Sequence, residues 1–239
     1  MLVKYCLLWY NIVLKILKVG FKMKKTLNTF VSSILAGLCI SLGGSIFLSL
    51  KDAFSGGNVV GALLFTIGLF VICTRGYHLF TGKVCYLFDN KPSYILELAV
   101  IWLGNLIGCC VSSALINITR IGSMSDTARV LVEIKMNDNP LSLFILGFFC
   151  NIFIFIAVNG YANNPHQLGK YLSLFLGVSI FILCGTEHSV ADMFYWSVSG
   201  VLYSSPLKSI GCILIITLGN AVGGVIIPLL EKLKDRLSK

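Results

Sequence analysis

Eight small and polar residues, Gly185 to Asp192, interrupt a long apolar stretch in the second half of the chain. Within this run, Glu187, His188 and Asp192 can hold charge or exchange a proton, and a histidine changes its charge close to neutral pH. At bilayer depth such groups are costly without partners, so the backbone around them must be buried in protein or line a water-accessible cavity. The run therefore indicates a membrane transporter or channel with His188 near its working centre.

A second interruption lies at residues 74–83 (TRGYHLFTGK), inside another apolar stretch of the first half. Broken helices at matching positions in two halves of a chain are a strong sequence pointer to a transport site. The N-termini of half-helices and their free backbone N–H groups carry partial positive charge. The pattern suits an anionic substrate.

An internal repeat relates the two halves. The pattern Leu-Gly-Asn-x-x-Gly occurs at residues 103–108 and again at residues 218–223. Three spans per half is an odd number, so the halves must be inverted relative to each other, with the substrate path at their interface. The glycines permit close helix packing, and each asparagine is expected to bond across helices or to face a cavity.

The composition places the whole chain in the membrane. It is 56% hydrophobic and 12% charged with a mean hydropathy of +0.88, whereas soluble domains carry about 25% charged residues. A helix needs about 20 residues to cross the hydrocarbon layer. The apolar stretches predict an all-α protein with six spans near residues 29–50, 59–86, 94–118, 141–162, 170–203 and 208–230. They form one channel domain at 26–230, between an N-terminal segment at 1–25 and a tail at 231–239.

The net charge of +9 reports topology rather than nucleic-acid binding, because of its distribution. Thirteen basic residues fall on the side that holds both termini, and five fall on the other. The positive-inside rule then predicts a multi-pass protein of the cytoplasmic membrane with both termini in the cytoplasm. Residues 1–22 are open to two interpretations: an amphipathic helix on the cytoplasmic face, or sequence upstream of a start at Met23.

The nine cysteines are expected to act as small hydrophobic residues. They include no C-x-x-C pair and no His/Cys set with the spacing of metal ligands. No metal and no other cofactor is therefore expected.

Five segments, taken in order, are similar to those of the formate/nitrite transporter family. They are Leu79-Phe80-Thr81, Trp102-Leu103-Gly104-Asn105, Cys150-Asn151, Glu187-His188-Ser189-Val190-Ala191 and Leu218-Gly219-Asn220-Ala221-Val222-Gly223-Gly224. The resemblance covers about residues 26–230. It implies an aquaporin-like fold with broken second and fifth helices, assembled as a homopentamer, in which each protomer has its own pore for formate, nitrite or hydrosulfide.

The resemblance also implies roles for single residues. His188 is similar to the central pore histidine, Thr81 to a threonine that hydrogen-bonds toward it, and Lys135 to a lysine that makes the outer vestibule positive. Asn151 and Asn220 resemble pore-side asparagines. The apolar residues that would form two constrictions around the histidine are Phe65, Leu69, Leu79, Phe80 and Phe181.

Two residues depart from the family pattern. Asp192 stands where asparagine is usual, and Arg75 lies in the first broken helix where small apolar residues are common. A buried arginine almost always has a partner, so we expect Arg75 to pair with Glu187 or Asp192.

Several alternatives remain open at this level. A neutral-solute channel of the water or glycerol type is the runner-up, although the chain lacks paired Asn-Pro-Ala signatures. A membrane enzyme is not expected, because no H-E-x-x-H motif or Gly-x-Ser-x-Gly context appears. The substrate could pass as the ion or as the neutral acid after protonation. The small residues Gly82 and Thr186, with the cysteine-rich composition, favour hydrosulfide slightly over formate and nitrite.

Overall fold

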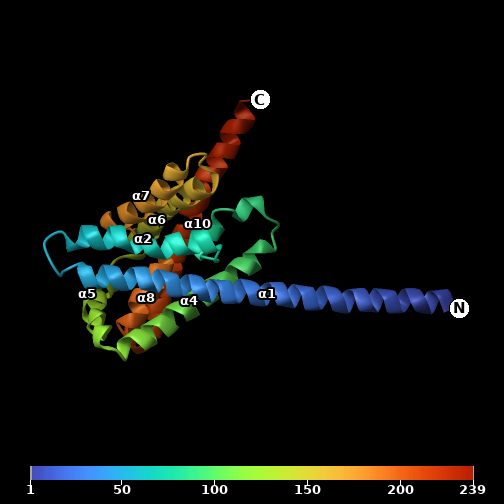
Figure 1. The fold of residues 1–239 in the computed structure, drawn as a ribbon, viewed down its shortest axis with the longest axis horizontal. Helices are drawn as coiled ribbons and strands as arrows, with labels where there is room; N and C mark the ends of the chain where they lie inside the picture. The colour runs from blue at the N-terminus through green and yellow to red at the C-terminus, as the bar shows by residue number, and fades with distance from the viewer. Residues whose placement is uncertain (1, 239) are drawn as a thin grey trace.

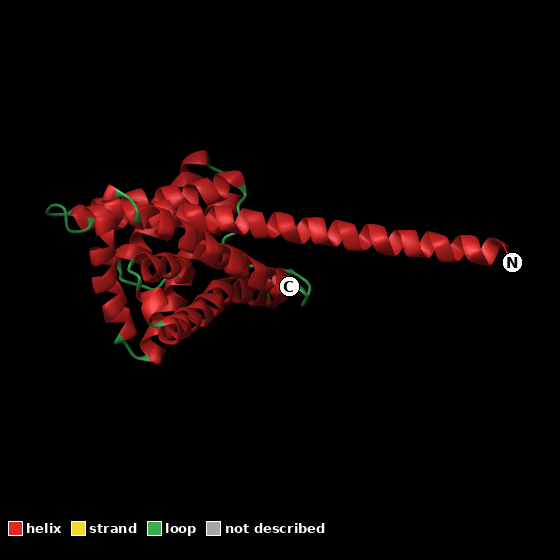
Figure 2. Cartoon of the chain, turned by 90° about the horizontal axis from the view of Figure 1, so that it is seen from below, coloured by secondary structure: helices red, strands yellow, loops and turns green. Residues whose placement is uncertain are grey.

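The protein is a bundle of helices in this computed structural model, which describes the backbone of residues 2–238 and the side chains of residues 23–238. No strand occurs in that part of the chain. Figures 1 and 2 show the arrangement. The α-helices are α1 (Leu2–Leu50), α2 (Gly57–Arg75), α3 (Phe80–Val84), α4 (Tyr94–Asn117), α5 (Met124–Met136), α6 (Pro140–Asn163), α7 (Gln167–Leu183), α8 (Ser189–Val198), α9 (Val201–Ser204) and α10 (Pro206–Leu237). Two 3-10 turns, η1 (Leu87–Asp89) and η2 (Arg120–Ser123), complete the described part.

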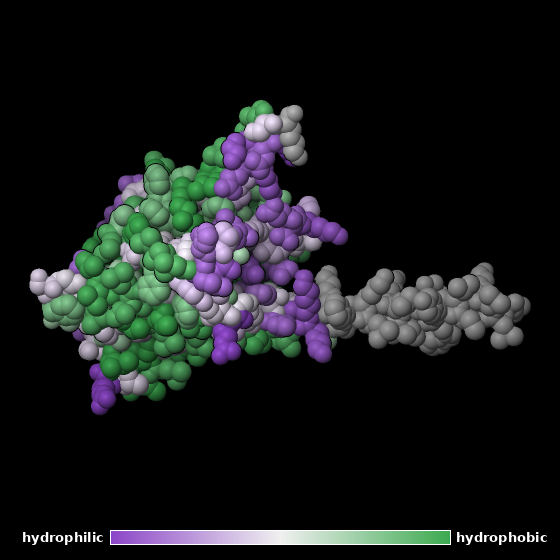
Figure 3. All heavy atoms as spheres, turned by 45° about the horizontal axis from the view of Figure 1, so that its top comes forward, coloured by the Kyte–Doolittle hydropathy of each residue, from purple (hydrophilic) through white to green (hydrophobic). Residues whose placement is uncertain are grey.

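Five of these helices are long and apolar enough to cross a bilayer: Met23–Leu50 of α1, and α2, α4, α6 and α10 in full. The fifth predicted span, at residues 170–203, contains the shorter apolar helix α7, which α8 continues beyond a break. Apolar side chains cover much of the bundle surface, and hydrophilic ones gather toward the end where α10 terminates (Figure 3). The prediction of an all-α multi-pass membrane fold is confirmed. The predicted interfacial segment at residues 1–22 lies outside the described side chains.

Both predicted breaks are present, and each is opened by a glycine. Gly76 follows α2 with φ 71°, and Gly185 follows α7 with φ 66°. A residue in the left-handed conformation ends a helix, because it lets the last carbonyls of the helix accept hydrogen bonds from N–H groups just beyond it. Glycine adopts this conformation without the steric cost that other residues pay. Accordingly the N–H of Tyr77 bonds Ile72 O and the N–H of Thr186 bonds Phe181 O. After each break a short helix resumes, α3 or α8.

The repeated motif places its glycines at two equivalent helix crossings. Gly108 of α4 packs against α1, where an added Cβ would lie 2.3 Å from the carbonyl oxygen of Ile34. Gly223 of α10 packs against α6, where an added Cβ would lie 1.9 Å from the carbonyl oxygen of Phe148. Neither site has room for a larger residue. The structure thus has two three-span halves with the same internal packing, as the repeat predicts.

The segment between the predicted spans 94–118 and 141–162 is mostly helical. Met124, Ala128 and Val132 are buried at four-residue intervals along α5, which packs against α8. This narrow apolar stripe is not evident in the sequence, because charged residues of both signs stand between its three positions. Lys135 therefore lies in the last turn of a packed helix, which fixes its position.

Candidate functional site

His188 and Thr81 join the two breaks at the centre of the molecule. His188 Nε2 lies 2.9 Å from Thr81 Oγ1, and both side chains are buried. The backbone N–H of Ala191 donates to His188 Nδ1 at 3.1 Å, so this nitrogen is an acceptor without a proton. The proton of the neutral imidazole is thereby assigned to Nε2, which donates to Thr81. The Thr81 hydroxyl hydrogen then remains to donate elsewhere.

Asn220 of α10 holds the break that carries His188. Its Oδ1 accepts the N–H of Ser189 at 2.9 Å, and its Nδ2 donates to the carbonyls of Glu187 and Gly147, both at 2.8 Å. The side chain satisfies backbone groups on both sides of His188 and ties them to α6. Buried backbone groups left open by a break need such partners. Asn220 is committed to the backbone and lines neither cavity described below.

Asn105 of α4 does the same in the first half. Its Oδ1 accepts the N–H of Phe80 at 2.9 Å, and its Nδ2 donates to the carbonyls of His78 at 3.0 Å and Ser33 at 2.8 Å. Each asparagine thus bonds the N–H that begins the short helix, a carbonyl two residues earlier and a carbonyl of the first span in its half. The repeat motif signalled this residue, but its bonding partners depend on the tertiary fold.

Asn151 of α6 supports Thr81 from the other half. Its Nδ2 donates to the carbonyl of Thr81 at 3.0 Å and lies 3.7 Å from Cys85 Sγ. Its Oδ1 is buried without a hydrogen-bond partner among the described residues. Asn151 therefore positions the threonine, and one buried acceptor remains beside it.

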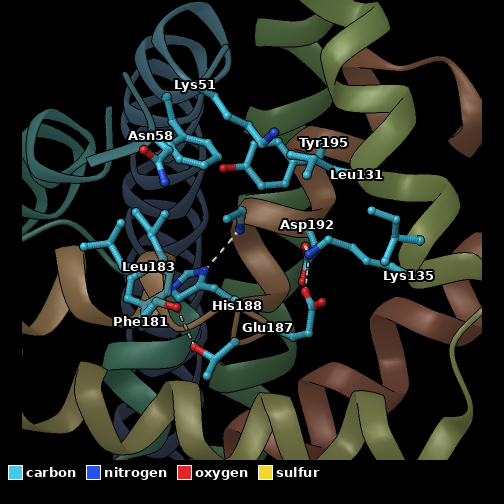
Figure 4. Close-up of a pocket in the computed structure, with 16 residues that line it drawn as sticks. Lys51, Asn58, Leu131, Lys135, Phe181, Leu183, Glu187, His188, Asp192 and Tyr195 are labelled. Carbon is cyan, nitrogen blue, oxygen red and sulfur yellow. Dashed lines mark hydrogen bonds and ion pairs between the residues drawn. The ribbon is translucent and has the colours of Figure 1, made fainter. Parts of the chain in front are cut away.

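The Lys135 cavity borders His188 on one side. This space of about 320 Å³ is lined by residues from five parts of the chain: Phe47, Lys51, Asn58, Leu131, Ile134, Lys135, Phe181, Ile182, Leu183, Gly185, Thr186, Glu187, His188, Ala191, Asp192 and Tyr195. Figure 4 shows the labelled side chains around it, with Lys51 and Lys135 projecting from different elements. Asn58 and Lys51 place it at the beginning of α2.

A buried cluster of three charges lies in the wall of this cavity. Lys135 Nζ contacts Glu187 Oε2 and lies 2.7 Å from Asp192 Oδ1 (Figure 4). Burial alone would lower the pKa of Lys135, but the Asp192 and Glu187 carboxylates outweigh burial and raise it above its ordinary value. Lys135 is therefore an ammonium ion that two carboxylates share. The second oxygen of Asp192, Oδ2, is buried without a partner in the described chain.

The expected pairing of Arg75 with these carboxylates is wrong. Arg75 is exposed at the end of α2, and none of the ion pairs among residues 23–238 includes it. Gly76 ends the helix immediately after Arg75, while Glu187 and Asp192 lie beside the cavity at the beginning of α2. The two groups are thus at opposite ends of a 19-residue helix, which spans about 28 Å at 1.5 Å per residue.

The Lys83 cavity borders the other side of the Thr81–His188 pair. Its volume is about 240 Å³, and it adjoins Thr81 through Gly82. The lining residues come from α2, the first break, α3 and α6: Leu69, Ile72, Cys73, Gly76, Tyr77, Leu79, Gly82, Lys83, Tyr86, Val158, Tyr161 and Ala162. Gly76 places it at the end of α2. The two cavities therefore open toward opposite ends of the bundle.

The five predicted constriction residues are distributed around this path. Phe181 lines the Lys135 cavity and stacks on the His188 ring at a centroid distance of 5.4 Å, and Phe65 packs edge-on against Phe181 at 6.2 Å. Leu69 and Leu79 line the Lys83 cavity. Phe80 is buried and lines neither cavity. Apolar side chains therefore lie on each side of the histidine, although the Lys135 cavity also has charged groups in its wall.

Comparison with known proteins agrees with this arrangement. A family model described as formate/nitrite transporter matches residues 11–231. The nitrite transporter NirC of Salmonella typhimurium is 31% identical over 84% of this chain and 80% of its own length. The formate channel FocA of Haemophilus influenzae is 26% identical over 85% of this chain and 84% of its own.

Solved structures show the same fold. A pentameric formate channel with formate bound superposes with a TM-score of 0.77 at 24% identity, covering 90% of this chain and 98% of that one. An ion channel of the same family superposes with a TM-score of 0.73 at 25% identity, over 86% and 89% of the two chains. Because the family model matches nearly the whole sequence and the spans, breaks and repeat agree with it, this chain belongs to the formate/nitrite transporter family, a family of channels and transporters rather than enzymes.

Proposed function

We propose that the protein conducts small monovalent anions of the formate and nitrite type, or their conjugate weak acids, past His188. The observation that carries this proposal is a buried histidine, bonded to Thr81, between two cavities that open toward opposite ends of the bundle. The names of the relatives, a nitrite transporter and a formate channel, support the same substrate class.

The substrate crosses the apolar wall as the neutral acid. Removing an ion from water costs several kcal/mol even after relaxation, and Phe181 and Leu79 offer nothing in return. A protonated His188 would compensate an anion, but its Nδ1 faces the N–H of Ala191, which repels a second proton. His188 therefore acts as a neutral donor, and Thr81 passes the hydrogen bond on to the substrate.

The individual substrate is a finer proposal. Formate and nitrite are supported by the relatives. The hydrosulfide branch rests on Gly82 and Thr186, two small residues that line the Lys83 and Lys135 cavities respectively. Selectivity in such a pore depends on its diameter and on a few donors, so flux measurements must decide among the three.

Flux into proteoliposomes tests the proposal. Purified protein would be compared with His188→Asn for uptake of formate, nitrite, hydrosulfide and glycerol at two external pH values. We expect weak-acid uptake that rises as pH falls, because the neutral acid becomes more abundant, and a loss of most of this uptake in His188→Asn. His166→Asn is the matched control, since His166 is exposed in a loop between α6 and α7.

Two results would contradict the proposal. Glycerol passage without preference for the acids would favour the neutral-solute channel. Unchanged flux in His188→Asn would make the histidine structural.

We further propose that the chain forms a homopentamer, because a structural relative is a pentameric formate channel and this chain exposes large apolar residues along its spans. Native mass measurement should give five times 26.1 kDa.

We also propose that both termini face the cytoplasm, on the basis of the distribution of basic residues. A reporter that works only in the cytoplasm should be active when fused after Lys239, and a reporter that works only outside the cytoplasm should be inactive there.

A further inference from the structure

The cavities on either side of the Thr81–His188 pair differ in charge. In the Lys135 cavity both lysines are paired: Lys135 with Glu187 and Asp192, and Lys51 with Asp52 at 3.1 Å. The Lys135 cluster alone holds two carboxylates against one ammonium ion. The field that this cavity presents to an approaching anion is therefore weakened by its own acidic groups.

Among the described residues, Lys83 is the one charged residue that lines the other cavity, and no acidic residue of that part of the chain lines it. No ion pair with Lys83 occurs in residues 23–238, where Lys25, Lys51, Lys135, Lys232 and Lys234 are paired. The side chain is half-buried. An ammonium ion that is partly shielded from water and has no carboxylate partner attracts a mobile anion more strongly than an ammonium ion in open water does.

The backbone of Lys83 is held next to the pore residues. Lys83 lies two residues after Thr81 on α3, its N–H donates to the carbonyl of Leu79 at 2.9 Å, and its carbonyl accepts the hydroxyl of Tyr94 at 3.2 Å. Three tyrosines, at 77, 86 and 161, line the same cavity. Their hydroxyl groups add neutral donors of the kind that orient a small oxyanion.

We propose that Lys83 binds the transported anion at this mouth, which makes the two mouths unequal in their affinity for it. This inference rests on the proposed function and adds a binding residue to it. The Lys83 cavity lies on the side where α10 terminates, because Tyr86 of its wall precedes η1 and Asp89 of η1 pairs with Lys232 of α10. With the proposed topology this is the cytoplasmic side, so anions are captured more readily from the cytoplasm than from outside.

Transport measured from each side separately tests the inference. Right-side-out and inverted membrane vesicles would be prepared from cells that express wild type, Lys83→Met, Lys83→Gln, Lys83→Arg or Lys91→Met. The apparent KM for radiolabelled formate would be measured in each at low and at high potassium gluconate. Lys91 is the matched control, because it is an exposed lysine near the same end that does not line the cavity.

We expect Lys83→Met and Lys83→Gln to raise the KM for formate presented to the α10 side by roughly fivefold, the factor for one partly screened ion contact. The KM from the other side should stay unchanged, Lys83→Arg should keep most of the affinity, and Lys91→Met should behave as wild type. The difference should shrink at high salt, because salt screens exposed charges.

Other outcomes would overturn the inference. If wild type transports formate but both neutral variants keep its KM from both sides, Lys83 binds no anion and the proposed function still stands. If the variants lower only the maximal rate, equally from both sides, Lys83 is structural. If the difference appears only with anionic lipid and vanishes in proteoliposomes of phosphatidylcholine alone, Lys83 binds a lipid phosphate. If wild type fails to transport formate, nitrite or hydrosulfide, the proposed function itself is wrong.

Discussion

The break between α2 and α3 and the break between α7 and α8 have the same backbone frame and different contents. Each opens with a left-handed glycine and is closed by an asparagine that bonds three backbone groups. Just before the short helix, the first break has His78 and Leu79, whereas the second has Glu187 and His188 at the matching positions. Because the asparagines satisfy the backbone, the side chains of the breaks are free to differ. The frame is repeated, and the chemistry resides mainly in the second half.

The largest expected effect concerns the charge cluster that only the second break has. Lys135→Met leaves Glu187 and Asp192 buried without a cation, which costs about 3–5 kcal/mol when one partner of a buried ion pair is removed. We expect a strongly lowered melting temperature in detergent. The double variant Lys135→Met with Asp192→Asn should recover part of the loss, since one carboxylate charge is then gone.

Arg75→Leu is the matched control for this prediction. Arg75 is exposed and has no ion pair in the described part of the chain, so its removal should change neither assembly nor flux. If Arg75→Leu were as unstable as Lys135→Met, the predicted ion pair between Arg75 and Glu187 or Asp192 would be supported after all.

The next effect tests whether the backbone of the two breaks is stabilised in the same way. Asn105→Ala and Asn220→Ala each leave three buried backbone groups without their partner, and one such orphaned group costs about 1–3 kcal/mol. We expect both variants to lose similar stability, about 3 kcal/mol, in thermal unfolding followed by near-ultraviolet circular dichroism. Asn163→Ala should change little, because Asn163 is exposed. A severe loss in one half only would show that the frames are not equivalent.

The smallest effect concerns the helix crossings behind each break. An added methyl group at Gly108 or Gly223 meets a backbone carbonyl at 2.3 Å or 1.9 Å, so alanine should destabilise by about 1–3 kcal/mol at either position. Gly211→Ala is the control on α10, because nothing lies within 4 Å of its added Cβ. It should be neutral or stabilising by up to about 1 kcal/mol through higher helix propensity. Equal losses at all three glycines would refute the packing argument.

Much of the fold could be predicted from the sequence because it follows from local composition. Apolar stretches of sufficient length define the spans, and the glycines with adjacent polar residues define the two breaks. The stripe of α5 was missed because its three apolar positions stand among charges of both signs. The partner of Glu187 and Asp192 was assigned to Arg75, and sequence distance offered no means to prefer Lys135.

The sequence by itself determined the class of protein: a membrane channel of two inverted halves, with His188 in the second of two broken helices. Hydrophobicity and backbone conformation are properties of short segments, so they can be read along the chain. Only the tertiary structure decided that Asn105 and Asn220 hold the breaks and that Lys135 is shared by two carboxylates. It also made Lys83 the one charged side chain, among the described residues, in the wall of its cavity. Those facts depend on which side chains come within hydrogen-bond distance when helices far apart in the sequence pack together, and short segments of sequence do not encode that packing.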